Sequence, residues 1–253
     1  MRKITSPQNP RLKALRKLHT RRGRAASCRF LAEGEDLVAA AAAAGRAAVE
    51  GYCLPGAGFA GFAEVDAAAL RDVSSLGSGT RVIGVYEQRW EEPRGPLCVY
   101  LHGVGDPGNV GTVLRSAQAF GAASVVLGPG CADPHSPKAV RASMGAIFGV
   151  ALARAASVQE LPGRRIALSA DAPEPLHGPL AAHGGEVTLL IGAERDGLPA
   201  DLVDACEAHA RIPIATESLN AAMAATVALY ELSRERGLHD APAPNRSSRV
   251  PAS

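Results

Sequence analysis

Three turns, each joining an apolar stretch to a helical one, carry most of the candidate chemistry of this 253-residue chain. The first follows Leu97–Leu101 and reads HGVGDPGNVGTVLR from His102 to Arg115. It supplies an amide, Asn109, and a cation, Arg115, close to the carboxyl end of a predicted strand. Open α/β sheets bind ligands at that end of their strands. The first turn therefore predicts one wall of a ligand site.

The glycines of this turn also allow a different interpretation, a dinucleotide-binding loop. Gly103, Gly105 and Gly108 have the spacing GxGxxG, which in such loops brings the backbone close to a pyrophosphate. However, Pro107 lies inside the turn, and no acidic residue ends a second strand about twenty residues later. A Walker loop is excluded because no GK[ST] sequence occurs. The proline and the missing acidic residue argue against the dinucleotide interpretation, which a nicotinamide-binding measurement would test.

The second and third turns have the same strand-to-helix character. Ile191–Leu198 reads IGAERDGL, in which a glycine lets the backbone approach a ligand and a glutamate follows. Alone, it is indistinguishable from an ordinary connecting loop. Ile212–Asn220 reads IPIATESLN and enters an alanine-rich helix. Ser218 is a suitable N-cap, so its hydroxyl has a structural explanation. Asn220, expected in the first helical turn, is less readily explained by capping.

Apolar strands alternate with helical patterns from residue 97 onward. The predicted strands are Leu97–Leu101, Ser124–Leu127, Arg165–Ser169, Val187–Ile191 and His209–Ile214. The predicted helices are Gly111–Phe120, Pro137–Phe148, Leu198–Cys206 and Leu219–Arg236. This alternation favours an α/β fold with a parallel sheet that helices cover on both faces.

A smaller α/β unit is expected before residue 90. Asn9 and Pro10 have the residue types of an N-cap and a first helical position, and this helix should fray near Gly23. Further strands are predicted at Phe30–Ala32, Gly51–Leu54 and Arg81–Tyr86, and further helices at Glu35–Ala44 and Asp66–Arg71. A polar linker at 87–96, with two prolines and the only tryptophan, should make this unit separable. The Pro- and Ser-rich tail, 239–253, is expected to be disordered.

The charge of +2 is unevenly distributed along the chain. Residues 1–32 hold ten Lys or Arg and no acid, which leaves 17 basic and 25 acidic residues in the remainder. Such asymmetry favours a nucleic-acid-contacting arm, although a solvated basic helix without a partner is the alternative. The candidate RNA-binding residues are Arg11, Lys13, Arg16, Lys17, Arg21 and Arg22.

Cysteine usage and hydropathy set the expected compartment. The five cysteines form no CxxC, and none has metal-ligand spacing with a histidine, so we expect reduced thiols and no metal site. No stretch of eighteen strongly apolar residues and no signal core occurs. These features predict a cytoplasmic protein that does not enter the membrane.

Together, the three turns resemble the three motifs of the SpoU (TrmH-like) RNA 2′-O-methyltransferases of the SPOUT class. The matching positions are Asn109 and Arg115, then Gly192, Glu194, Gly197 and Leu198, then Ile212-Pro213-Ile214 and Ser218-Leu219-Asn220. The segment PKAVRASMGAIF resembles the family's middle helix, and SPQNPRLKALRKL with RFLAEGEDLV resembles a ribosomal-protein-like RNA-binding domain. Two departures are a short loop between Ile214 and Ser218, and Ile214 itself, where methionine is common.

The resemblance implies a domain organisation and an activity. It assigns 1–90 to an RNA substrate-binding domain and 97–238 to a catalytic domain with a C-terminal trefoil knot, through which two copies form a homodimer. The implied activity is methylation of a ribose 2′-hydroxyl, with S-adenosylmethionine as cofactor. The extra N-terminal domain favours 23S rRNA over tRNA as the substrate. A catalytically silent RNA-binding protein is the other alternative, which cofactor titration would test.

The resemblance also implies roles for individual residues. The catalytic set is Arg115, Asn109, Glu194, Ser218 and Asn220. The cofactor-binding set is Gly192, Ile212, Leu219, Ile214, Gly197, Ser169 and Ala170. Because a guanidinium rarely loses its proton, Arg115 is better suited to gripping an RNA phosphate and relaying the 2′-proton than to acting as a base. The other four catalytic residues would orient Arg115 and the ribose.

Overall fold

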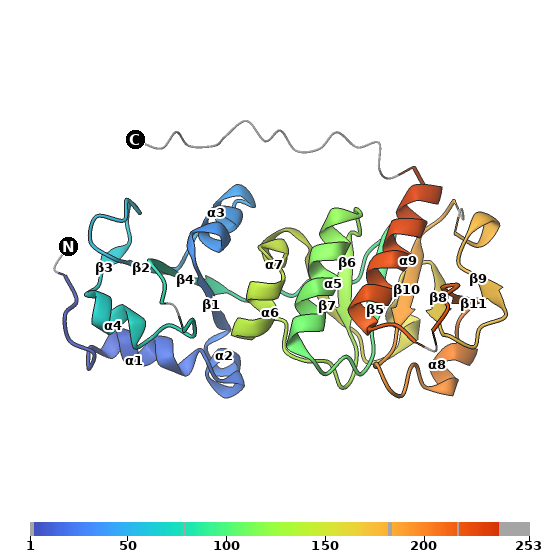
Figure 1. Ribbon diagram of the computed structural model, residues 1–253, viewed down its shortest axis with the longest axis horizontal. Helices are drawn as coiled ribbons and strands as arrows, with labels where there is room; N and C mark the ends of the chain where they lie inside the picture. The colour runs from blue at the N-terminus through green and yellow to red at the C-terminus, as the bar shows by residue number, and fades with distance from the viewer. Residues whose placement is uncertain (1–2, 78, 182–183, 217, 238–253) are drawn as a thin grey trace.

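The computed structural model describes residues 3–77, 79–181, 184–216 and 218–237 (Figure 1). An N-terminal unit lies at one end of the molecule. Its elements are α1 (Pro10–Lys17), α2 (Arg21–Ser27), β1 (Arg29–Glu33), α3 (Glu35–Ala43), β2 (Glu50–Cys53), β3 (Ala63–Glu64), α4 (Ala67–Arg71) and β4 (Val82–Glu87). The strands form one sheet in the order β1-β4-β2-β3, with β4 antiparallel to both its neighbours. The expected small α/β unit is confirmed.

The first helix ends earlier than the sequence suggested. The Asn9 side chain accepts a hydrogen bond from the amide of Arg11, as expected of an N-cap, but α1 stops at Lys17. A second helix, α2, then begins at Arg21, because Thr20 caps it by accepting from the amide of Gly23. A Cβ on Gly23 would lie 2.0 Å from the carbonyl oxygen of Lys17, so this glycine permits the turn between the two helices. The expectation of one helix fraying near Gly23 was wrong.

The larger unit carries a seven-stranded sheet. Its elements are β5 (Leu97–Leu101), α5 (Pro107–Ala119), β6 (Ser124–Leu127), α6 (Pro137–Ala142), α7 (Ala146–Gly149), β7 (Ala151–Arg154), β8 (Arg164–Leu168), β9 (Glu174–Pro175), β10 (Val187–Ile191), α8 (Ala200–Asp204), β11 (Ala208–Arg211) and α9 (Ala221–Glu235). Every strand pairing is parallel, in the order β7-β6-β5-β10-β8-β11-β9. The predicted parallel sheet is confirmed.

Helices cover both faces of this sheet, and the alternation along β5 shows how. Val99 and Leu101 face a core that includes Val113 of α5 and Leu229 of α9. Tyr100, pointing the other way, packs in a second core against which α8 lies. Each face of the central strand is therefore buried, as parallel sheets require.

Several element boundaries differ from the expected ones, for identifiable reasons. The predicted helix over 137–148 is broken into α6 and α7, because Met144 and Gly145 adopt left-handed φ angles of 49° and 95°. A Cβ on Gly145 would lie 2.4 Å from that of Ala40, so α3 requires a glycine there. The strand β11 stops at Arg211, just before Pro213, which lacks a backbone donor. The short strands β3, β7 and β9 were not predicted.

The two units share one hydrophobic core. Phe30 of β1 and Tyr86 of β4 both pack on Phe148 of α7, with ring centroids 5.8 Å and 4.8 Å apart. The joining segment also packs, since Trp90 lies against the same core and under the guanidinium of Arg154. Removal of the first unit would expose this apolar surface, so the expectation of easy separability is not supported. The domain limits 1–90 and 97–238 remain predictions.

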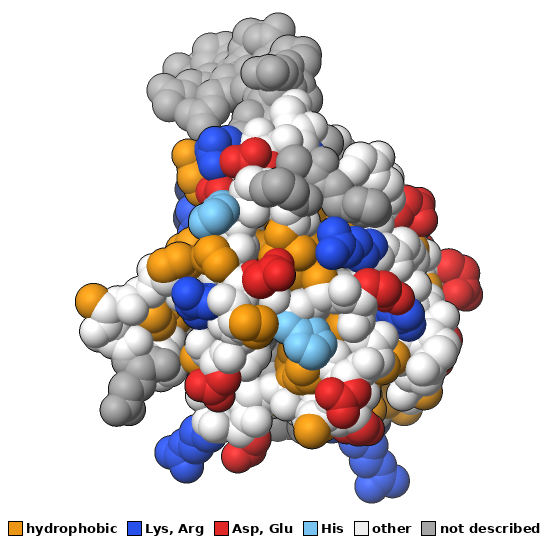
Figure 2. All heavy atoms as spheres, turned by 90° about the vertical axis from the view of Figure 1, so that its right-hand side faces the viewer, with side chains coloured by type: hydrophobic (Ala, Val, Ile, Leu, Met, Phe, Trp, Pro, Cys, Tyr) orange, Lys and Arg blue, Asp and Glu red, His pale blue; other side chains and the backbone are white. Residues whose placement is uncertain are grey.

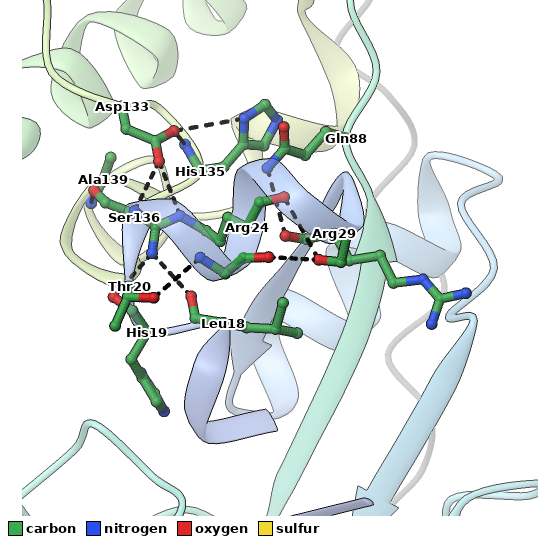
Figure 3. Close-up of polar contacts among 12 residues, drawn as sticks. Leu18, His19, Thr20, Arg24, Arg29, Gln88, Asp133, His135, Ser136 and Ala139 are labelled. Atoms are coloured by element: carbon green, nitrogen blue, oxygen red, sulfur yellow. Dashed lines mark hydrogen bonds and ion pairs between the residues drawn. The ribbon is translucent and has the colours of Figure 1, made fainter. Parts of the chain in front are cut away.

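A buried ion pair also joins the two units (Figure 3). The Arg24 side chain, 4% exposed, donates through Nε to Oδ2 of Asp133 at 2.8 Å and through Nη1 to the carbonyls of Leu18 and His19. Burial lowers the pKa of the adjacent His135, so its ring is neutral at neutral pH. Among the described residues, Arg24 is therefore the cation that pairs with Asp133, and this arginine is structural.

Replacing Asp133 with alanine should reduce the free energy of unfolding by about 3 kcal/mol, because Arg24 would stay buried without its counter-charge. Asp72→Ala is the matched control. It removes the partner of Arg16 in an ion pair whose carboxylate is 56% exposed, and should cost under about 1 kcal/mol. Urea denaturation of both variants checks the difference. Equal, small effects would contradict a stabilising role for the junction pair.

No helix among the described residues is long and apolar enough to cross a membrane. The tail expected to be disordered, 239–253, lies outside the described residues.

Candidate active site at the carboxyl edge of the sheet

A cavity of about 350 Å³ opens where β8, β10 and β11 end. This volume falls in the range of small-molecule sites. Its walls come from 168–171, 191–198, Ile212, Ile214, 218–219, Ala221 and Ala224. All seven positions proposed to bind a cofactor line it, namely Ser169, Ala170, Gly192, Gly197, Ile212, Ile214 and Leu219. Residues that are up to about fifty positions apart in the sequence thus line one cavity.

The turn after β10 closes tightly on itself. Ala193 and Gly197 exchange two backbone hydrogen bonds, of 3.1 Å and 3.0 Å, and Gly197 has a left-handed φ of 64°. A Cβ on Gly192 would lie 2.1 Å from the carbonyl carbon of Gly197. The close approach expected at Gly192 therefore occurs within the turn itself, and a glycine is required there before any ligand is considered.

Three of the proposed catalytic residues, one from each turn, form a polar cluster beside the cavity. Glu194 Oε1 accepts hydrogen bonds from Nδ2 of Asn109 and, at 3.1 Å, from Nδ2 of Asn220. The same Asn220 amide lies 3.3 Å from Oδ1 of Asn109. Glu194 also lines the cavity, as does Ser218. The three motifs are thus adjacent in space, but no residue of the first turn is among the described residues that line the cavity, so the expectation that this turn forms one wall of it was wrong.

Asn220 has a structural role that sequence reasoning assigned to Ser218. Its Oδ1 caps α9 by accepting from the amides of Ala222 and Met223, at 3.0 Å and 3.3 Å. Asparagine is as good an N-cap as serine, and the helix begins two residues later than expected. The same side chain therefore caps the helix through its oxygen and holds Glu194 through its nitrogen.

This division of roles gives a direct test. Asn220→Asp keeps the capping oxygen but replaces the donor with a second carboxylate facing Glu194, so activity should fall about a hundredfold through misplacement of the cluster. Unfolding free energy should stay within about 0.5 kcal/mol, whereas Asn220→Ala should lose about 1 kcal/mol by removing the cap. Parallel activity and denaturation measurements separate the two roles. Unchanged activity in Asn220→Asp would refute the importance of the donor.

Asp106 and Lys138 support the first turn and were missed in the sequence. Asp106 caps α5, with Oδ1 accepting from the amides of Gly108 and Asn109 at 2.6 Å and 3.1 Å. Lys138 donates to its other oxygen at 2.6 Å and holds the pKa of Asp106 below its ordinary value. The available signal was Asp before Pro107, an N-cap followed by a first-turn proline. That proline starts α5 four residues earlier than expected and fixes Asn109 in its first turn.

Arg115 lies apart from this cluster. It is exposed on α5, about 9 Å along the helix axis from Asn109, and does not line the cavity. The next residue, Ser116, contacts the hydroxyl of Thr226 at 2.6 Å and so packs α5 against α9. Within one copy of the described chain, the structure does not bring Arg115 to the other four proposed catalytic residues.

The basic N-terminal residues divide into two groups. Arg11, Lys13, Lys17, Arg21 and Arg22 are exposed on α1 and α2. Four others form ion pairs: Lys3 with Asp66, Arg16 with Asp72, Arg24 with Asp133, and Arg29 with Glu50. The opposite end of the molecule, shown in Figure 2, carries intermixed acidic and basic side chains. The exposed cations of α1 and α2 thus remain candidates for RNA contacts, whereas Arg16 is already engaged in its ion pair with Asp72.

No three His, Cys, Asp or Glu side chains gather in a geometry for metal binding within the part of the chain that the structure describes. The free cysteines are dispersed through both units.

The fold defines an α/β domain with a cavity of small-molecule size at the ends of β8, β10 and β11, joined to a small basic α/β unit. The chain belongs to the SpoU rRNA methylase family, whose profile matches residues 96–230. Residues 9–91 match the MRM3-like substrate binding domain. The resemblance inferred from the three motifs is confirmed.

Similar proteins match nearly the whole chain. An uncharacterised tRNA/rRNA methyltransferase of Synechocystis sp. is 31% identical, over 92% of this chain and 94% of its own. The 23S rRNA (guanosine(2553)-2′-O)-methyltransferase RlmP of Bacillus subtilis is 27% identical, over 92% of this chain and 99% of its own. The AdoMet-bound rRNA methyltransferase of Sinorhizobium meliloti superposes with a TM-score of 0.81 at 30% identity, over 92% of this chain and 97% of its own.

Proposed function

We propose that this protein transfers a methyl group from S-adenosylmethionine to a ribose 2′-hydroxyl of RNA. The observation that carries the proposal is that the second and third turns line one cavity, while the first turn contributes Asn109 to the Asn109–Glu194–Asn220 cluster beside it. Because the polar positions of all three motifs are filled, an enzyme is favoured over a catalytically silent RNA-binding protein.

The cavity has the chemistry that S-adenosylmethionine requires. Ile212, Ile214 and Leu219 offer an apolar wall for the adenine ring, and backbone groups at the ends of three strands offer donors and acceptors. The lining also includes Asp171, Glu194 and Asp196, whose carboxylates complement a ligand that bears a sulfonium and an ammonium group. We assign the seven lining positions given above to cofactor binding.

The chain's own residues have to position the ribose and manage its proton. When bound, the cofactor supplies an electrophilic methyl group. The Asn109–Glu194–Asn220 cluster and Ser218 present hydrogen-bonding groups beside the cavity and orient the ribose. Arg115 grips an RNA phosphate through its guanidinium and helps the 2′-proton to leave through that phosphate. An exposed position on α5 suits such a contact with a large substrate.

A second copy of the chain is the proposed partner for α9. Met223 and Val227 are 62% and 43% exposed, one helical turn apart, and Tyr230, 48% exposed, continues this apolar stripe. The stripe starts three residues after Asn220, so a copy covering it would lie near the polar cluster. Sedimentation equilibrium tests for the homodimer. The trefoil knot in the same domain remains a prediction.

The proposed substrate is 23S rRNA in preference to tRNA. The relative RlmP is named for 23S rRNA, and the chain carries the additional substrate-binding unit with five exposed cations. A cytoplasmic location follows from such a substrate.

The test is methyl transfer from labelled S-adenosylmethionine to 23S rRNA and to tRNA, both taken from cells that lack the gene. Digestion and mass analysis should then find a single 2′-O-methylated nucleotide that carries the label, and find it in 23S rRNA. Cofactor binding without transfer to either RNA would favour the silent RNA-binding protein instead. Binding of a nicotinamide nucleotide in place of S-adenosylmethionine would favour the dehydrogenase interpretation.

A further inference from the structure

A second cavity, of about 330 Å³, lies between the two units and takes no part in the site described above. We call it the junction groove. It is lined by Arg21 of α2, by Gln88 and Trp90 of the joining segment, by Arg154 at the end of β7, and by the loop 127–134. It thus opens at the carboxyl ends of β6 and β7.

The groove presents two cations, one of which is held in place by an aromatic ring. Arg154 is exposed, yet its guanidinium carbon lies only 3.8 Å from the centroid of the Trp90 ring. Trp90 is held in turn by the core and by an edge contact with His135, at 5.3 Å between centroids. A stacked guanidinium keeps its N–H groups free at its edge, where they can bind a phosphate in two-pronged fashion. Arg21 supplies the second cation.

The single carboxylate that lines the groove does not cancel these charges. Asp133 is already paired with Arg24, which is buried and also donates to the carbonyls of Leu18 and His19 (Figure 3). The groove is therefore electropositive through Arg21 and Arg154. The groove also contains the side chain of Gln88, whose amide nitrogen donates to the carbonyl of Arg29 at 3.4 Å, and the flat guanidinium of Arg154 stacked on Trp90. Guanidinium planes of this kind stack on unpaired bases in RNA-binding proteins.

Backbone contacts link the groove to the active site. The amide of Gly103 donates to the carbonyl of Pro129, and that of Ala132 to the carbonyl of Val104, both at 2.9 Å. From Val104 the chain runs through Asp106 to Asn109 of the polar cluster. The groove at β6 and the cavity at β10 are two strand spacings apart, about 10 Å, on the same edge of the sheet. One RNA strand can therefore occupy both.

We propose that the junction groove binds an unpaired nucleotide of the substrate RNA, in the same strand as the target ribose, with its phosphate held by Arg154 and Arg21. The inference rests on the proposed function, because it takes RNA as the substrate. It assigns the space between the two units to RNA binding, whereas the sequence pointed only to α1 and α2. The shared hydrophobic core and the buried Arg24–Asp133 pair would then hold the two walls of this site in a fixed relative position.

The test compares Arg154→Ala and Arg21→Ala with Arg164→Ala, which removes an arginine at the start of β8, on the opposite edge of the sheet. The probe is a labelled single-stranded RNA of mixed sequence, followed by anisotropy over a range of salt concentrations. Each groove variant should weaken binding about tenfold and reduce the salt slope by about 0.7, the value for one lost single-strand phosphate contact. Arg164→Ala should change neither, and affinity for S-adenosylmethionine should be unaltered in all three.

Three outcomes would overturn the assignment in different ways. If Arg154→Ala behaves like Arg164→Ala while the unaltered protein binds RNA and methylates it, the groove assignment is wrong and the proposed function stands. If both groove variants weaken a fully paired RNA duplex as much as the single strand, the site does not select an unpaired nucleotide. If the unaltered protein binds cofactor but no RNA, the proposed function itself fails.

Discussion

Replacing Arg115 with alanine should lower methyl transfer by about 10²–10⁴-fold, the contribution typical of a group that assists proton transfer. Affinity for S-adenosylmethionine should stay within a few-fold, because Arg115 lies on α5 and outside the cavity. Single-turnover assays beside isothermal titration measure the two effects separately. Arg115→Lys should recover little activity, since an ammonium lacks the planar fork that grips a phosphate.

Arg164→Ala is again the matched loss of one arginine remote from the cavity, and should keep full activity. Near-normal turnover in Arg115→Ala would reject its catalytic assignment. A parallel loss of cofactor affinity would show instead that Arg115 acts through the pocket.

The separation of Arg115 from the polar cluster suggests one more arm of this experiment. If two copies build each site together, Arg115→Ala and Asn220→Asp chains should complement each other when mixed. One of the two sites in a mixed dimer would then hold an intact Arg115 from one copy and an intact Asn220 from the other. If each site is built from one copy, the mixture should be no more active than its components.

The residues that line the proposed cofactor cavity could be predicted from the sequence because they depend on main-chain geometry at strand ends. Turns that follow strands of one parallel sheet must meet at one edge, so Gly192 and Ile212 fall together without any knowledge of packing. The same reasoning brings Asn109, Glu194 and Asn220 within hydrogen-bonding distance.

Features that depend on contacts between distant segments were not accessible in this way. Asn220 became the N-cap because α9 begins at Ala221, a boundary that Ser218 could have set equally well by residue type. Gly145 breaks the middle helix because α3 packs against it, and α3 lies a hundred residues earlier. Trp90 looked like part of a polar linker, yet a core shared by both units holds it in place. In each case the outcome depends on tertiary contacts that the local sequence pattern does not reveal.

The second substitution with a large expected effect is at Gly192, in the turn after β10. Gly192→Ala should weaken S-adenosylmethionine binding about tenfold to a hundredfold, because its Cβ would lie 2.1 Å from the backbone of Gly197 and the turn must open. Holding the backbone in such a strained arrangement costs about 1–3 kcal/mol, which the bound state would have to overcome. The larger Gly192→Val should abolish binding and also lower thermal stability, since the obstruction is intramolecular.

Gly184→Ala is the control, because a Cβ there meets no atom within 4 Å and the residue lies outside the cavity. Titration calorimetry and thermal unfolding of the alanine variants separate ligand binding from folding. We expect Gly184→Ala to match the unaltered protein in both. A folded Gly192→Ala variant with unchanged affinity would mean that the 192–198 turn does not shape the cofactor site, and the cavity would need another ligand.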